Sequence, residues 1–177
     1  VLQLAQRAFQ LHLFKSTIIN DQHSMLIKDH VEYDLSILVP VLLKLGTLKE
    51  PEIPIEKYIH YVKSNDKELL PLVLELVEST FTSNTKKFIL PLIDPDIKPS
   101  KVAIGLFDTK FLPKDDFLLL WMESNHIWKK NISLDYCLKN EKINLLKKID
   151  WKSIKSVNTI YNFLNKTEKL YLNRNFM

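Results

Sequence analysis

Glycine is scarce in this chain. Of 177 residues only Gly46 and Gly105 are glycines, against an average of roughly 7% in proteins. Sheet proteins use glycine in many of their tight turns, so its scarcity argues against a β-rich fold. Two glycines this far apart also cannot form the glycine-rich loops of P-loop and Rossmann proteins. The sequence therefore favours a helical protein and excludes those two nucleotide sites.

Cysteine and long apolar runs are also lacking. Cys137 is the one cysteine, so no internal disulfide can form, and a reducing compartment is indicated. The longest apolar stretches, 35–45 and 69–76, are interrupted by proline, lysine or glutamate and are shorter than the roughly 20 residues of a membrane-spanning helix. We therefore expect a cytoplasmic location, which includes the inner face of a membrane if the chain is part of a larger protein.

The chain begins at Val1 rather than at a methionine. We take this as a sign that the sequence is a fragment of a larger protein. Its length fits one domain over 1–177. At 46% hydrophobic and 26% charged residues, the composition is that of an ordinary folded protein.

Positive charge gathers at the C-terminal end. Residues 139–177 contain nine lysines and arginines against three acidic residues, although the whole chain carries only +4. One interpretation is a solvated, lysine-rich surface; the other is a basic surface that meets nucleic acid or an anionic membrane. The candidate residues are Lys142, Lys147, Lys148, Lys152 and Lys155.

The stretch 66–94 is the most apolar helical pattern in the sequence. Its apolar residues cover more than one side of a helix over 66–81, and such a helix is buried between neighbours on two sides. A polar turn at 82–84 and a helix over 87–93 follow. We therefore expect 66–81 to be the central helix of a stacked array. The predicted structural core comprises Leu74, Leu76, Leu92, Trp121 and Trp128.

Nearly every other segment also has helical periodicity. Asp34 is a suitable N-cap for a helix over 35–45, with Gly46 just past its end, and Pro40 is expected to kink that helix. The remaining predicted helices are 2–30 with a break at 20–24, 54–63, 100–107, 113–122, 125–137, 143–149, 154–164 and 169–173. Short helices joined by short polar loops are typical of an α-solenoid, and an irregular helical bundle is the alternative fold.

The central stretch resembles a HEAT repeat. Residues 55–94 contain a helix, a Ser-Asn-Asp turn, an apolar helix with Leu74-Glu75-Leu76, and then Pro91-Leu92-Ile93-Asp94. This order is similar to the helical repeats of bacterial membrane proteins of the nucleotide-translocase-like and major-facilitator type, which Trp128 also fits. The resemblance covers about 31–139. It implies an all-α, right-handed HEAT-type superhelix attached to a membrane-embedded domain elsewhere in the full-length protein.

The resemblance departs from the family pattern in two places. Leu72 and Val73 stand where the family has small residues. Residues 160–177 are similar to the segment that leads into a cyclic-nucleotide-binding domain, but the phosphate-binding cassette of that domain is absent. No nucleotide site is therefore predicted.

Histidines and cysteine offer no catalytic pattern. His23 and His30 are seven residues apart and could share a helix face with Asp29, but a surface or interhelical role explains them as well, and the chain contains no H-E-x-x-H motif or metal-type cysteine cluster. Cys137 follows Tyr136 on an apolar helix and is expected to be a buried, small hydrophobic residue. No glycine flanks a serine as in a nucleophile elbow.

Acidic pairs and tryptophans have structural explanations too. Asp94 with Asp96, and Asp115 with Asp116, precede predicted helices, where N-capping and the helix dipole account for them. Trp121 and Trp128 would suit a helical-repeat DNA glycosylase, but core packing is the role that we expect for them. We expect a non-enzymatic interaction or regulatory module that binds a protein partner and uses no cofactor or metal. The alternative is a nucleic-acid-binding helical-repeat protein that uses its basic end.

Overall fold

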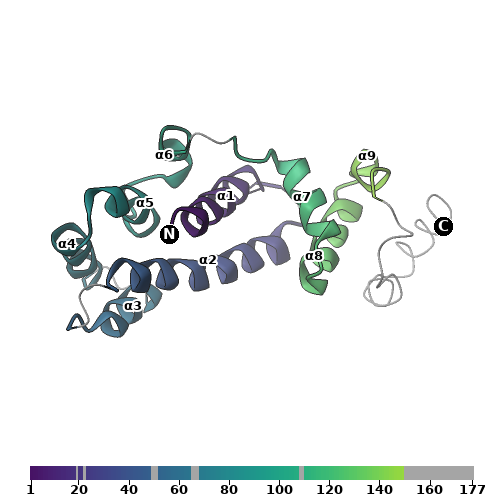
Figure 1. Cartoon of the computed structure of the whole chain (residues 1–177). Coiled ribbons are helices and arrows are strands. Elements are labelled where there is room, and N and C mark those ends of the chain that lie inside the picture. Colours follow the sequence, from purple (N-terminus) through teal and green to yellow (C-terminus); the bar gives the residue numbers. More distant parts are fainter. Residues whose placement is uncertain (19, 22, 49–51, 65–67, 108–109, 150–177) are drawn as a thin grey trace. The chain divides into compact units, whose positions relative to one another are not determined.

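The structure is a computed structural model that describes residues 1–18, 20–21, 23–48, 52–64, 68–107 and 110–149. Within these ranges all regular secondary structure is helical (Figure 1), which confirms the all-α class. The helices are α1 (Leu2–Ile18), α2 (Met25–Gly46), α3 (Ile55–Ser64), α4 (Leu70–Thr80), α5 (Ser83–Ile93), α6 (Pro99–Leu106), α7 (Lys114–Glu123), α8 (Ile127–Lys139) and α9 (Ile143–Leu146). The helices predicted over 154–164 and 169–173 lie outside the described residues.

The chain divides into two compact units. Unit 1 contains residues 1–16 and 31–111, and unit 2 contains residues 17–30 and 112–177. Unit 2 is described as far as Ile149. The prediction of one HEAT-like domain over 1–177 stays a prediction, because part of unit 2 lies outside the described residues.

The core of unit 1 is richest along α1 and α2. Its fully or almost fully buried side chains on these helices are Ala5, Ala8, Phe9, Leu11, Phe14, Val31, Leu42 and Leu43. Two ion pairs join the helices: Arg7 with Asp34 at 3.7 Å, and Lys15 with Glu32 at 2.8 Å. Asp34 lies inside α2 rather than at its start, so the prediction that it caps a helix is wrong. Ile27, Val31 and Leu35 continue one buried face at i, i+4 spacing, so the helix begins at Met25.

Helix α4 is not the buried centre of an array. It packs against α3 on one side and α5 on the other, but only Val73 and Val77 are buried among its residues. Leu74 and Leu76 are half-buried, and Leu72 is 46% exposed. The expectation from the apolar run was wrong because the leucines of α4 are only partly covered, and Leu72 and Leu76 line an open pocket on the side of α3.

Gly46 ends α2 at a position where no larger residue fits. A Cβ atom placed on Gly46 would overlap the aromatic ring of Phe81, which is buried just after α4. The backbone of α2 and the end of α4 can therefore approach closely only because residue 46 lacks a side chain. Gly105 in α6, by contrast, has open space where a Cβ would lie.

Unit 2 is built around α7 and α8, which pack against each other, while α9 packs on α8. Phe117, Leu118, Trp121 and Met122 are the buried residues of α7. On the following helix Leu134, Tyr136 and Cys137 are at most 2% exposed. Apolar residues three and four positions apart thus give α7 one buried face, whereas α8 is buried on more than one side, over residues 129–134 and at Tyr136 and Cys137.

Candidate functional site

Of the five predicted core residues, one is fully buried. Trp121 is 4% exposed in unit 2, where its ring lies 5.2 Å from Phe117 and 5.4 Å from His30 between centroids. Leu74, Leu76 and Leu92 are half-buried. Trp128 is 56% exposed, so its assignment to the core is wrong. It stands in the first turn of α8. The buried residues of that helix are Ile132, Leu134, Tyr136 and Cys137 together with the polar Lys129, Lys130, Asn131 and Ser133.

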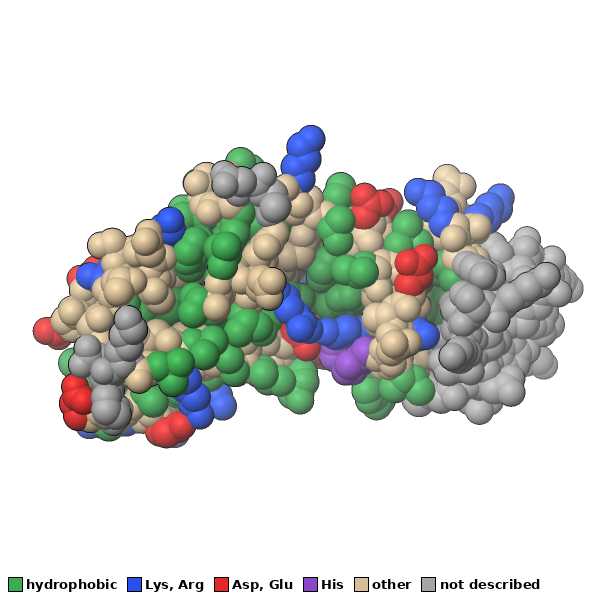
Figure 2. All heavy atoms as spheres, in the orientation of Figure 1, with side chains coloured by type: hydrophobic (Ala, Val, Ile, Leu, Met, Phe, Trp, Pro, Cys, Tyr) green, Lys and Arg blue, Asp and Glu red, His purple; other side chains and the backbone are tan. Residues whose placement is uncertain are grey.

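The basic surface predicted at the C-terminal end is present only in part. Lys147 and Lys148 are exposed after α9. Lys142, however, donates to Asp115 at 2.9 Å, so its charge is neutralised within unit 2. Lys152 and Lys155 lie outside the described residues. On the face shown in Figure 2, lysines and arginines of the described part are spread in small groups rather than gathered in one patch.

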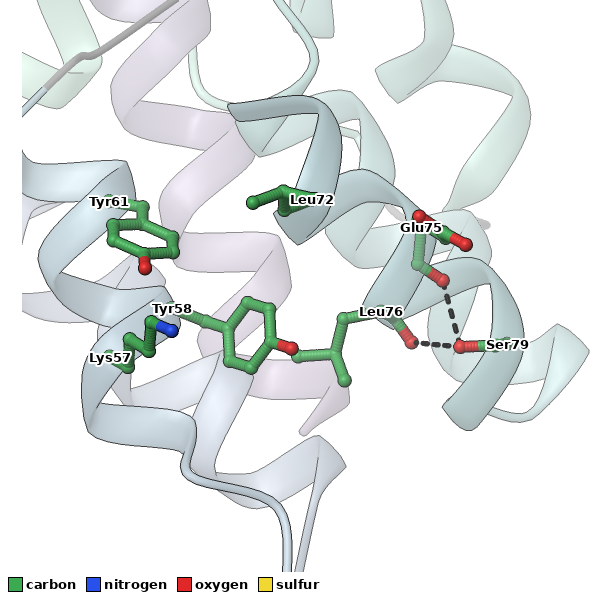
Figure 3. Close-up of a pocket in the computed structure, with 7 residues that line it drawn as sticks. All are labelled: Lys57, Tyr58, Tyr61, Leu72, Glu75, Leu76 and Ser79. Carbon is green, nitrogen blue, oxygen red and sulfur yellow. Dashed lines mark hydrogen bonds between the residues drawn. The ribbon is translucent and has the colours of Figure 1, made fainter. Parts of the chain in front are cut away.

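The strongest site candidate is a groove between α3 and α4, within unit 1. It is an open pocket of about 290 Å³ lined by Lys57, Tyr58, Tyr61, Leu72, Glu75, Leu76 and Ser79. Figure 3 shows the two tyrosines projecting from α3 toward Leu72 and Leu76, which project from α4. We name this feature the α3–α4 groove. Its volume is near the lower end of the roughly 300–1,000 Å³ of small-molecule sites, which favours a few inserted side chains over a whole enclosed ligand.

The local sequence explains why the groove stays open. Successive residues of an α-helix are about 100° apart, so Val73 and Val77 point to the core while Leu72, Glu75, Leu76 and Ser79 share the outer face. Ser79 turns its hydroxyl back onto its own helix and donates to the carbonyl oxygen of Glu75 at 2.8 Å. The wall contributed by α4 therefore consists of two leucines, one glutamate and one serine whose hydroxyl is bonded to its own helix.

The α3 wall is aromatic and carries a cation. The centroids of Tyr58 and Tyr61 are 6.1 Å apart. Lys57 places its Nζ 5.7 Å from the centroid of Tyr61, within the distance at which an ammonium interacts with an aromatic ring. Glu56, on the same helix, is engaged elsewhere in an ion pair with Lys44 at 2.6 Å. Lys57 is thus the one cation that lines the described groove.

A second polar cluster lies within unit 2. Asp21, in the loop that follows α1, accepts hydrogen bonds at Oδ2 from the Lys114 ammonium at 3.0 Å and from the Tyr136 hydroxyl. Lys142 pairs with Asp115 beside it. We call Asp21, Lys114, Tyr136, Asp115 and Lys142 the Asp21 network.

Burial and hydrogen bonding within the Asp21 network shift the pKa values of Asp21 and Tyr136. Burial alone would raise the pKa of Asp21, but hydrogen bonds from Tyr136 and Lys114, with the charges of Lys114 and Lys142, lower it overall. Burial and the bond to Asp21 raise the pKa of Tyr136 far above its ordinary value. Neither group is therefore poised to exchange protons near pH 7, as a general acid or base must be. The network therefore has a structural role, since it joins the loop after α1 to α7 and α8.

Other candidate chemical groups are also accounted for structurally. Burial raises the pKa of Cys137 to about 12, so its thiol is protonated and unreactive. Asp94 accepts a hydrogen bond from the main-chain N–H of Asp96 at 2.9 Å in the turn after α5. This differs from the predicted N-cap, because the N-cap position of α6 is Lys98. Asp115 and Asp116 do lie in the first turn of α7, where negative charge complements the helix dipole.

Metal chemistry finds no support in the described part of the chain. No group of three or more histidine, cysteine, aspartate or glutamate residues converges there as metal ligands would. His30 instead meets Trp121, and its ring centroid is 5.6 Å from that of His126. His23 precedes α2, which begins at Met25, so it does not share a helix face with His30 as was considered from the sequence.

Sequence reasoning missed both sites. The groove has a signal that could have been noticed: Tyr58 and Tyr61 at i, i+3 beside Lys57, facing a leucine pair at i, i+4. The Asp21 network has none, because its hydrogen-bonded partners Asp21 and Tyr136 are 115 residues apart in the chain.

Among the described helices, none is both long and apolar enough to cross a membrane. Comparison of the chain with protein-family models, with curated proteins and with solved structures finds no match.

Proposed function

We propose that this chain is a non-enzymatic, helical-repeat interaction module of HEAT type, which holds a segment of a partner protein in the α3–α4 groove. The observation that carries the proposal is the exposed apolar wall of that groove. Leu72 is 46% exposed in the first turn of α4, although Val73 and Val77 on another face of the helix are buried. Ordered apolar surface at a concave site between two helices is typical of protein-binding surfaces.

The chemistry of the groove supports binding rather than catalysis. Tyrosines bring large contact areas at low conformational cost, and they are enriched where proteins bind each other. Lys57 and Glu75 stand at the edges of the groove, where charged residues set specificity more than affinity. The resemblance to transporter-associated HEAT repeats is the reason for placing the module in the cytoplasm, on a larger protein with a membrane-embedded part.

A matched pair of substitutions tests the proposal. Leu72→Arg puts a charge on the groove wall, whereas Ile104→Arg puts one on α6 of the same unit, where Ile104 is 81% exposed and does not line the groove. The full chain would be used as bait in native lysate with membranes included. We expect a defined, nuclease-insensitive partner to be lost with Leu72→Arg and retained with Ile104→Arg. Recovery of the same partner by both variants would contradict the groove assignment.

A nucleic-acid binder is the second candidate, favoured by exposed Lys147 and Lys148. Binding through phosphates releases counterions, so the affinity would fall steeply as salt is raised. Recovery that disappears with nuclease, together with weakened binding of duplex DNA by Lys147→Glu/Lys148→Glu, would favour this function. Partner recovery that is insensitive to nuclease, together with unchanged DNA binding by Lys147→Glu/Lys148→Glu, would exclude a nucleic-acid-binding function.

A further inference from the structure

Two pairs of facing side chains line the α3–α4 groove, each with a tyrosine from α3 and a leucine from α4. We call each pair a rung. Figure 3 shows Tyr61 level with Leu72, and Tyr58 level with Leu76. Tyr58 and Tyr61 are three positions apart on α3, and Leu72 and Leu76 are four positions apart on α4. The two rungs are therefore separated by about one helical turn, or roughly 5.4 Å. A partner helix presents side chains at i and i+4 with this same spacing.

The walls of the groove offer side chains only. The main-chain N–H and C=O groups of α3 and α4 are used within the helices, so the groove has no sheet edge to which an extended peptide could add a strand. Recognition must therefore come from apolar side chains that enter between the rungs. An amphipathic helix meets this requirement because it carries its own backbone hydrogen bonds into the groove.

The two edges of the groove carry opposite charge. Around α3 the order from the edge to the core is Lys57, Tyr61 and Tyr58, at about 100° per residue. Around α4 the corresponding order is Glu75, Leu72 and Leu76. Glu75 is exposed, and α4 contains no basic residue from Leu70 to Thr80. A cation therefore borders one side of the groove and an anion the other.

From this geometry we propose that the occupant is an amphipathic helix with an apolar i, i+4 seam, an acidic flank that faces Lys57 and a basic flank that faces Glu75. This inference rests on the proposed function and adds the class and direction of the partner segment. Turning a helix end for end in the groove exchanges its two flanks. The opposite charges at the edges thus select one of the two directions in which the seam could dock.

The test uses three synthetic helical peptides with the same leucine seam. One has glutamates on one flank and lysines on the other, one has glutamates on both flanks, and one has lysines on both. Binding to the full chain is measured by fluorescence anisotropy at low salt. We expect the mixed peptide to bind about two- to fivefold more tightly than either uniform peptide, as exposed ion pairs allow, and this preference to vanish in 1 M salt.

Charge exchange on the protein provides the control. Lys57→Glu alone makes both edges acidic, so the peptide with lysines on both flanks should become the tightest binder. The double variant Lys57→Glu/Glu75→Lys should restore preference for the mixed peptide and reverse its direction, which a spin label on the peptide N-terminus reports through broadening of protein NMR signals. Both side chains are exposed, and substitutions at exposed positions usually change stability little, so folding is preserved.

Each remaining outcome overturns the inference in a distinguishable way. Equal binding of all three peptides, abolished by Leu72→Arg, would leave the groove as a binding site and reject the flank assignment. No binding of any peptide would reject a helical occupant, while loss of the lysate partner with Leu72→Arg would still uphold the proposed function. Concentration-dependent dimerisation of the chain that Leu72→Arg abolishes would identify a second copy as the occupant and reject a separate partner.

Discussion

The α3–α4 groove of unit 1 and the Asp21 network of unit 2 use the same kinds of residue in opposite ways. In the groove, tyrosines, a lysine and a glutamate line an open surface, and the lysine ammonium lies over a tyrosine ring. In the network, a tyrosine, two lysines and two aspartates are closed upon one another. Charges that satisfy each other stabilise a fold, whereas charges at the edge of an apolar surface remain available to a partner.

Removing the acceptor of the network should have the largest effect. Asp21→Ala leaves the Lys114 ammonium and the Tyr136 hydroxyl without their shared carboxylate, and hydrogen bonds to charged groups are worth about 1.5–3 kcal/mol each. We expect a loss of about 3 kcal/mol of unfolding free energy, measured by urea denaturation. Asp29→Ala, at an exposed position of the same unit, is the control and should change stability by less than about 0.5 kcal/mol. Equal effects of the two variants would show that the Asp21 network does not stabilise the fold.

Acid should weaken the two units in different pH ranges. Burial, and to a smaller extent the charge of Lys15, lowers the pKa of His12 in unit 1 from 6.5 to about 4. In the unfolded chain His12 is protonated below about pH 6.5, whereas in the folded chain it stays neutral until the pH approaches 4. The folded state is therefore destabilised as the pH falls from 6.5 toward 4. The shift of the His12 pKa corresponds to about 3 kcal/mol of unfolding free energy.

The Asp21 contribution has a lower pH window. Its folded pKa lies below the ordinary 3.8, so its stabilisation is complete above that value and is lost only as the pH falls through the folded pKa. Denaturation of His12→Gln between pH 7 and 4 separates the two groups. A decline as steep as in the unsubstituted chain would show that His12 is not its source.

The two glycines sharpen the comparison within unit 1. Gly46→Ala forces a Cβ into the ring of Phe81, and overpacking of this kind costs about 1–3 kcal/mol. Gly105→Ala meets open space in α6 and should instead stabilise that helix by about 0.5–1 kcal/mol. Thermal denaturation should therefore shift in opposite directions, and shifts of the same sign would contradict the close approach of α2 to Phe81.

Substitutions on the two faces of α4 should differ in their effect on stability. Val77→Ala removes two methyl groups from a fully buried side chain, which costs about 2 kcal/mol at roughly 0.8 kcal/mol per group plus a cavity term. Leu72→Ala removes a larger but 46% exposed side chain, and we expect it to cost less than about 1 kcal/mol while weakening partner binding. A larger stability loss from Leu72→Ala than from Val77→Ala would show that Leu72 is a core residue and would contradict the α3–α4 groove as an open surface.

Helical periodicity predicted most of the helices but not which of their faces are buried. The segments 54–63, 113–122 and 125–137 correspond closely to α3, α7 and α8, because their patterns are local. Helix α2 was predicted too short because Asp34 is a good cap in isolation, yet its carboxylate pairs with Arg7 from α1. The burial expected at Leu74, Leu76 and Trp128 depended on neighbours that the sequence does not name.

The sequence by itself determined the helical class, the short connections and the absence of glycine-rich nucleotide loops. Each of these follows from backbone preferences and from spacing within one or two turns of helix. Only the tertiary structure decided that the leucines of α4 line a groove, that Gly46 must accommodate Phe81, and that Asp21 accepts from Lys114 and Tyr136. Such contacts join residues from different helices, and packing between helices depends on shapes and distances that no local pattern contains.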